Sequence, residues 1–133
     1  FGENIKYGYF SQDVNGLDDN LTNFGNLEVT GVDSTAIHRE ARSLGLSESE
    51  LKKKPSELSR GQQAKLSFAK LLLAENQLLI LDEPTNHLDI PTRERIEAAL
   101  QNYQGAMVVA SHDKYFCRQI GIHSTINLDK EEK

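Results

Sequence analysis

The segment LLILDEPTNHLD at residues 78–89 decides the fold. Its first four residues are apolar, and the next two, Asp82 and Glu83, are carboxylates. A short apolar run of this kind predicts a strand buried in a parallel sheet. Ligands of open α/β sheets bind at the carboxyl ends of the strands. The segment therefore predicts that Asp82 and Glu83 lie at the ligand-binding edge of an α/β sheet.

Two other segments predict strands that end in polar side chains. Residues 5–10 are rich in β-forming residues and lead to Gln12, and residues 106–111 are apolar and lead to His112. Strands that alternate with helices form parallel sheets, so their carboxyl ends share one edge. We therefore expect the polar ends of these strands to lie at the same edge as the two carboxylates.

Helix signals fill the intervals between the strands. A loop-prone stretch over 13–33 precedes a helix that Ser34 caps and Gly45 ends. A short helix capped at Ser47 should end before Pro55, because the residue before a proline avoids the helical region. Later helices are expected over about 59–75, from Asp89 to Gly105, and over about 114–120.

The helix that begins at Ser59 has an unusual start. Ser59 and Gln62 form a capping box, in which each side chain bonds the other residue's backbone amide. The free amides and the dipole of a helix start favour an anion. Gly61 would let a phosphate approach the backbone closely, and the Ser59 hydroxyl would add a donor. An ordinary helix cap is the alternative interpretation, and this segment is also one.

The order of these motifs resembles the ATP-binding cassette (ABC) ATPases. In that family a helix that opens in Leu-Ser-x-Gly-Gln, a strand that ends in Asp-Glu and a strand that ends in His follow one another. This chain has LSRGQ at 58–62, and its PTNHLD at 84–89 resembles the ABC-F branch. The resemblance implies ATP and Mg²⁺ as ligands. It also implies a phosphate-loop NTPase sheet with an inserted helical subdomain.

The resemblance implies a role for each polar group at the sheet edge. Asp82 would hold Mg²⁺, and Glu83 would polarise the water that attacks the γ-phosphate. Neighbouring residues on a strand point to opposite sides, so the two carboxylates cannot do the same job. His112 would contact the γ-phosphate and orient the glutamate and the water. Gln12 would sense both Mg²⁺ and the γ-phosphate. A polar, exposed strand end is the alternative, and the motif order disfavours it.

The resemblance also implies a second cassette as partner. Ser59, Arg60, Gly61 and Gln62 match the ABC signature, which binds the γ-phosphate of ATP held by another cassette. Asp89 closes the segment that matches the D-loop, which contacts the partner cassette. The partner could belong to the same chain or to a second copy.

The phosphate-binding loop itself is missing from the sequence. No Gly-x-x-x-x-Gly-Lys-Ser/Thr occurs, and in the family this Walker A loop precedes the segments present here. We therefore interpret the chain as the C-terminal part of one nucleotide-binding domain. We expect a helical subdomain over 13–75 and a core made of 1–12 and 76–133. The sheet would lack the strand that enters the loop and keep the strand with the two carboxylates at its centre. We expect 125–128 or a second molecule to fill the open edge beside 106–111.

Composition narrows the class of protein. The chain has 133 residues, 38% of them hydrophobic and 26% charged, which suits one ordinary globular domain. Its apolar runs are too short to span a bilayer, so direct membrane insertion is not expected. The single Cys117 suits a reducing cytoplasm. The net charge of −5 argues weakly against a nucleic-acid grip by this surface.

Three functions are compatible with the sequence, and the sequence favours them in the following order. The first is an ABC-F ATPase that acts on the ribosome, in translation or in antibiotic resistance, with its RNA contacts in regions outside this chain. The second is the ATPase subunit of a membrane transporter, where Ser-Ala-Leu-Asp is the more usual D-loop. The third is a non-catalytic dimerisation module, and the intact Glu83 argues against it.

The missing loop generates the first prediction. Phosphate affinity in this fold comes mainly from the backbone amides and the lysine of the phosphate loop. Calorimetry of this chain with Mg-ATP should therefore show no binding tighter than about millimolar, roughly 4 kcal/mol. A micromolar dissociation constant would contradict the prediction.

Overall fold

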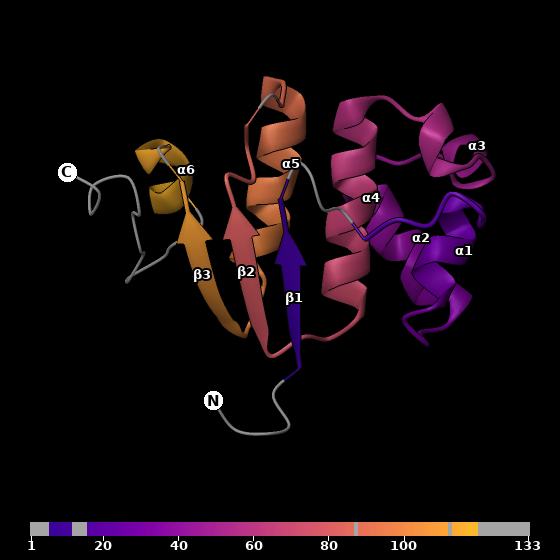
Figure 1. Cartoon of the computed structure of the whole chain (residues 1–133), viewed down its shortest axis with the longest axis horizontal. Helices are drawn as coiled ribbons and strands as arrows, with labels where there is room; N and C mark the ends of the chain where they lie inside the picture. Colours follow the sequence, from indigo (N-terminus) through magenta and orange to yellow (C-terminus); the bar gives the residue numbers. More distant parts are fainter. Residues whose placement is uncertain (1–5, 12–15, 87, 112, 120–133) are drawn as a thin grey trace.

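The computed structural model describes residues 6–11, 16–86, 88–111 and 113–119. Three strands form one parallel sheet, with helices packed against it and beside it (Figure 1). The sheet order is β1–β2–β3, and the strands are β1 (Tyr7–Phe10), β2 (Leu78–Asp82) and β3 (Ala106–Ala110). The predicted fold class, α/β with a parallel sheet, is confirmed. The strand that carries the two carboxylates is the central one, as expected.

The register of the sheet aligns the three carboxyl ends. Tyr7 pairs with Leu78 on one side of β2, and Leu78 pairs with Ala106 on the other. At the far end Asp82 pairs with Ala110. The last residues of all three strands therefore reach the same edge, where the three arrowheads point in Figure 1.

Most of the described helices lie between β1 and β2. That interval holds four helices and a 3₁₀ turn, one further helix lies between β2 and β3, and another follows β3. Their bounds are α1 (Asn23–Glu28), α2 (Ser34–Ser43), α3 (Glu48–Leu51), the turn Pro55–Glu57, α4 (Arg60–Leu73), α5 (Ile90–Gln101) and α6 (Lys114–Gln119).

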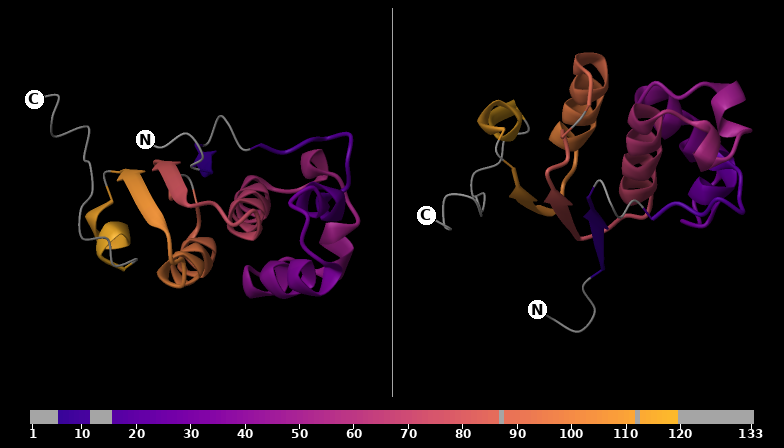
Figure 2. Two further views of the ribbon diagram at one scale, coloured as in Figure 1. Left: turned by 90° about the horizontal axis from the view of Figure 1, so that it is seen from below. Right: turned by 45° about the horizontal axis from the view of Figure 1, so that its top comes forward.

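In the described part of the chain, helices cover one face of the sheet. Figure 2 shows α4, α5 and α6 on the same side of the strands, with α1, α2 and α3 grouped beyond α4. The row that faces the helices, Phe10, Leu81 and Val109, is at most 1% exposed. On the opposite face Tyr7 and Tyr9 are 62% and 41% exposed. The alternation of strand side chains thus separates a buried face from an open one.

Two predicted helix boundaries are wrong. Asp33, and not Ser34, is the N-cap of α2, and its carboxylate accepts a hydrogen bond from the Ala36 amide at 2.8 Å. Both residue types are good caps, so the local sequence did not separate them. The helix α5 ends at Gln101, with Asn102 as its C-cap, before Gly105 is reached. By contrast Gly45 ends α2 as predicted, with a left-handed φ of 87°.

The core joins the sheet to the helical group. Phe68 of α4 is fully buried, and its ring centroid lies 4.7 Å from that of Phe10 on β1. The apolar spacing of α4 predicts a buried stripe of Leu66, Ala69, Leu72 and Leu73; Leu72 is only partly buried, the other three are buried, and the stripe omitted Phe68. This aromatic pair fastens α4 to the edge strand of the sheet.

Two further sequence predictions concern the open edge of the sheet and the membrane. Residues 125–128, expected at the edge beside β3, lie outside the described residues, so that prediction stays open. None of the helices in the described ranges is long and apolar enough to cross a membrane.

Removing Phe68 tests the core. Phe68→Ala should lower the free energy of unfolding by about 3–5 kcal/mol, because it removes buried aromatic surface and leaves a cavity. Urea denaturation followed by circular dichroism measures the change. Tyr7→Ala is the matched control, since its ring is 62% exposed and should be lost at little cost. Equal losses in the two variants would contradict the assignment of the core.

Candidate functional site

The polar groups predicted to form a site gather at one end of the molecule. The helices α4, α5 and α6 begin at the end where the strands finish (Figure 1). Asp82 is the exposed last residue of β2, and Glu83 follows it half-buried. Gln12 and His112, the two other predicted groups of this edge, lie outside the described residues. The described part of the site therefore centres on the turn after β2.

Glu83 does not continue the strand. Its backbone has a left-handed φ of 48°, which is uncommon for a residue other than glycine. Its amide donates to the carbonyl oxygen of Ala110 at 2.7 Å and so extends the ladder between β2 and β3 by one bond. The argument that Asp82 and Glu83 point to opposite sides of one strand is therefore wrong in its geometry. The turn, and not strand alternation, separates the two carboxylates.

Asp82 has one neighbour from the adjacent strand. The Tyr9 hydroxyl donates to its Oδ2 at 3.4 Å, a long and weak bond. No group of three or more His, Cys, Asp or Glu side chains that could hold a metal occurs in the described ranges. Within the described residues, Asp82 is the exposed carboxylate at the end of the central strand that could contact a cation.

The start of α4 has the predicted capping box. The Gln62 amide donates to Ser59 Oγ at 3.2 Å, and the Ser59 amide donates to Gln62 Oε1 at 2.9 Å. Gln62 Nε2 also donates to a carboxylate oxygen of Glu50. Both polar ends of the Gln62 side chain are thus occupied within the chain, whereas Arg60 is exposed.

Glu50 connects this cap to a second one. Its other carboxylate oxygen accepts from the Ser47 amide at 2.8 Å, which completes the predicted capping box of α3. Its backbone carbonyl accepts from Asn23 Nδ2 of α1 at 2.7 Å. One glutamate thereby joins the starts of α3 and α4 and the first helix. The start of α4 is therefore held by its own capping box and, in addition, by the bond from Gln62 to Glu50.

Gly61 lies beside the start of α5. A Cβ built at this position would lie 3.5 Å from Thr92 Oγ1 and 3.8 Å from Asp89 Oδ1, which is ordinary contact. Asp89 is the N-cap residue of α5, as predicted. Hydrogen bonding from Thr92, chiefly from its side chain, holds the pKa of Asp89 below its usual range. Among the described residues, none lies close enough to require a glycine at 61.

Sequence reasoning missed the carboxylate of Asp113. Its Oδ2 lies 2.9 Å from Arg93 Nη2 and accepts from the Thr85 hydroxyl at 3.4 Å. Its Oδ1 accepts from the Phe116 amide at 2.9 Å. An aspartate directly before a predicted helix is a sequence signal for an N-cap. Its pairing with Arg93 and Thr85 could not be read from local sequence.

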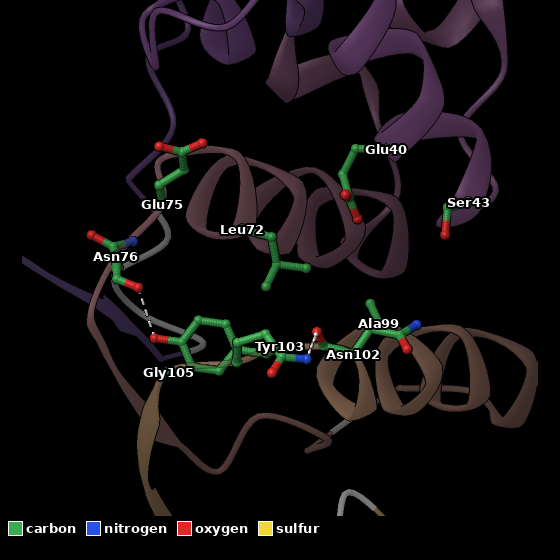
Figure 3. A pocket seen from close by; sticks show the side chains of 10 residues that line it. Glu40, Ser43, Leu72, Glu75, Asn76, Ala99, Asn102, Tyr103 and Gly105 are labelled. Carbon is green, nitrogen blue, oxygen red and sulfur yellow. Dashed lines mark hydrogen bonds between the residues drawn. The ribbon is translucent and has the colours of Figure 1, made fainter.

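The opposite end of the helices contains a hollow of about 390 Å³. Figure 3 shows Glu40 of α2 pointing toward it, over Leu72 and Ala99. The Tyr103 hydroxyl donates to the carbonyl oxygen of Asn76 at 2.9 Å at one side of the hollow. Burial raises the pKa of Glu40. None of the predicted site residues lines this hollow.

Comparison with known protein families and sequences finds clear relatives. A family model described as ABC transporter matches residues 3–86, well over half of the chain. ABC transporter F family member 5 of Arabidopsis thaliana is 51% identical over 70 residues, which are 53% of this chain and 10% of the relative. The ribosome protection protein VmlR of Bacillus subtilis is 41% identical over 75 residues, or 56% of this chain and 14% of the relative. The matches thus span a small part of each relative.

Comparison with solved structures finds the same architecture. The dimeric ATP-binding cassette MJ0796, in a post-hydrolysis state bound to ADP and Pi, superposes with a TM-score of 0.74 at 26% identity. The match covers 86% of this chain and 56% of that one.

The half-buried Glu40 generates a pH-dependent prediction. Burial raises its pKa above the ordinary 4.5, so the folded chain holds this proton to higher pH than the unfolded chain. Stability is therefore lost as pH rises through that raised pKa, and the loss remains at neutral pH. Glu40→Gln should raise the melting temperature at pH 7, and the gain should disappear near pH 4, about where carboxyl groups protonate in both states.

The control for this measurement is Glu28→Gln. Glu28 is exposed at the end of α1, so this variant removes the same charge without removing a buried one. Melting curves of the two variants across the pH range isolate the effect of burial. A Glu40→Gln variant that is less stable than the native chain at pH 7 would contradict the prediction.

Proposed function

The chain belongs to the ABC transporter family of ATP-binding cassette proteins, and on this premise we propose that it supplies part of an ATP-hydrolysing site. It would provide the carboxylates of one cassette and the signature segment that faces a second cassette. The observation that carries the proposal is the turn after β2, which presents Glu83 at the carboxyl edge in a left-handed conformation. Such backbone strain clusters at functional sites.

Glu83 is the proposed catalytic residue. Its carboxylate would polarise the water that attacks the γ-phosphate and accept a proton from it. Its backbone is fixed by the bond to Ala110, so the side chain starts from a defined position. His112, assigned by its place after the third strand, would contact the γ-phosphate and orient the water. Gln12 would contribute from the end of the first strand.

Asp82 fits a Mg²⁺ site. Mg²⁺ in nucleotide sites is bound by one or two carboxylates together with phosphate oxygens and water. The carboxylate is exposed at the end of the central strand, and its bond from Tyr9 is long, which suits it for that purpose. When bound, Mg²⁺ neutralises charge on the phosphates of ATP.

The start of α4 supports a phosphate contact. A glycine in a helix costs about 1 kcal/mol relative to alanine, and the chain has space for a Cβ at Gly61. No contact that would exclude a side chain here is found among the described residues, which supports a contact from outside the chain. We assign it to a phosphate of ATP held by a partner cassette, with Ser59 and Arg60 as further donors. Asp89, beside Gly61, would contact that cassette.

The second cassette is the proposed partner. The superposed cassette MJ0796 is dimeric, and a signature segment that faces outward needs a facing nucleotide. In this arrangement each site combines the carboxylates of one cassette with the signature segment of the other. The partner would be a second cassette of the same protein or a second copy.

An ABC-F protein that acts on the ribosome is the finer proposal. It is supported by the D-loop sequence at 84–89 and by the relatives named F family member 5 and ribosome protection protein. This proposal places the protein in the cytoplasm. The second candidate is the ATPase subunit of a membrane transporter, supported by the description of the matching family model. The two candidates differ in where an ATP-trapped variant collects, on ribosomes or on membranes.

Glu83→Gln tests the proposal in the full-length protein. The variant should bind ATP but hydrolyse it about 10²-fold more slowly or worse, since it removes a positioned general base. Phosphate release and equilibrium ATP binding measure the two effects. Glu75→Gln is a matched control, because Glu75 is also a left-handed glutamate (φ 56°) but follows α4 at the other end of the molecule. Turnover at the native rate in Glu83→Gln would refute the proposal.

Sedimentation of the trapped variant with ribosomes or with membrane vesicles separates the two candidates.

A further inference from the structure

The carboxylate of Asp113 joins three elements at the proposed active end. It accepts from the backbone of α6 through Phe116, from the turn after β2 through Thr85, and pairs with Arg93 in the first turn of α5. The Asp113 amide in turn donates to Ser111 Oγ at 2.9 Å. Both oxygens of one carboxylate are therefore used, and each bond reaches a different segment.

This arrangement exceeds the needs of a helix cap. A cap requires one bond from the side chain to an amide of the first turn, and Phe116 already provides it. The Arg93–Asp113 pair has side chains that are 29% and 24% exposed, so the pair is screened less than a surface pair. A charged bond of this length is shorter and stronger than a neutral one. The short pair with Arg93 therefore fixes the carboxylate against α5, and the Thr85 hydroxyl adds a long, weaker bond from the turn after β2.

The position of these residues in the sequence connects the cluster to the proposed chemistry. Thr85 follows Glu83 by two residues, and Asp113 immediately follows His112. We infer that Asp113 is a positioning residue that holds the start of α6 beside the segment of Glu83. Arg93 fixes Asp113 from α5. This inference rests on the proposed function, because it concerns the same hydrolytic step.

The physical basis is orientation of the reacting groups. Misplacing a catalytic group by about 1 Å can slow a reaction about 10²-fold without loss of substrate binding. A residue that only stabilises the fold would instead change the folded fraction. The two roles are separated by kcat and KM measured on the folded protein.

The experiment uses the full-length protein with Asp113→Asn and Arg93→Gln. Asparagine remains a good cap but cannot form the ion pair, so α6 should keep its start. We expect kcat to fall about tenfold or more in either variant, while KM for ATP changes less than about threefold. The double variant should lose little more than either single variant, because both remove the same contact. Arg95→Gln is the matched control, since Arg95 lies two positions away on α5 and donates to Ser43.

Each outcome supports or overturns the inference. Native kcat in both single variants, or losses that simply add in the double variant, would overturn it. If Asp113→Asn fails to fold, Arg93→Lys and Thr85→Val perturb the same carboxylate more mildly, and native kcat in both would also overturn it. Glu83→Gln, measured under the same conditions, distinguishes a failure of the positioning role from a failure of the proposed function. If Glu83→Gln is slow and the Asp113 and Arg93 variants are not, only the positioning role fails. If Glu83→Gln turns over at the native rate, the proposed function fails and the positioning role fails with it.

Discussion

The parallel pairing of β2 with strands on both sides is the constraint on which the rest of the structure depends. Side chains of a strand alternate between faces, so a shift of one residue would exchange Leu81 and Ile80 between the core and the open face. The same register brings Asp82 level with the end of β3 and lets the next amide bond to Ala110. Core packing and the placement of the carboxylates are therefore set by one pairing.

Two polar clusters fix the helix starts that surround this edge. Glu50 ties the start of α4 to α3, and Asp113 ties α6 to α5 and to the turn after β2. Each cluster begins as a helix cap and then reaches a segment far away in sequence. Caps satisfy the amides that a helix start leaves free, so they place polar side chains where an anion would also bind. In this chain cap side chains already accept from amides at the starts of α3, α4 and α6.

The sequence predicted those features that local chemistry determines. The strands, the capping boxes at Ser47 and Ser59 and the glycine that ends α2 all depend on residues a few positions apart. The resemblance to phosphate-loop sheets also placed the central strand correctly.

What could not be predicted depends on distant partners or on backbone geometry. The Arg93–Asp113 pair joins residues 20 positions apart, and the Glu50–Gln62 bond joins two separate helices. The left-handed turn at Glu83 overturned the strand argument, because glutamate carries no signal for that conformation. Gln12 and His112 lie outside the described residues, so their assignment still depends on their place in the motif order.

The conformation of Glu83 has a consequence for selection. A non-glycine residue held in the left-handed region costs on the order of 1 kcal/mol, and glycine or asparagine adopts that region more easily. A library of variants of this chain selected only for thermal resistance would therefore be drawn toward glycine or asparagine at position 83. Such a screen would remove the carboxylate while it improved the fold. If Glu83 is the catalytic residue proposed above, the stability of the fold and the rate of hydrolysis make opposite demands on the residue at this position.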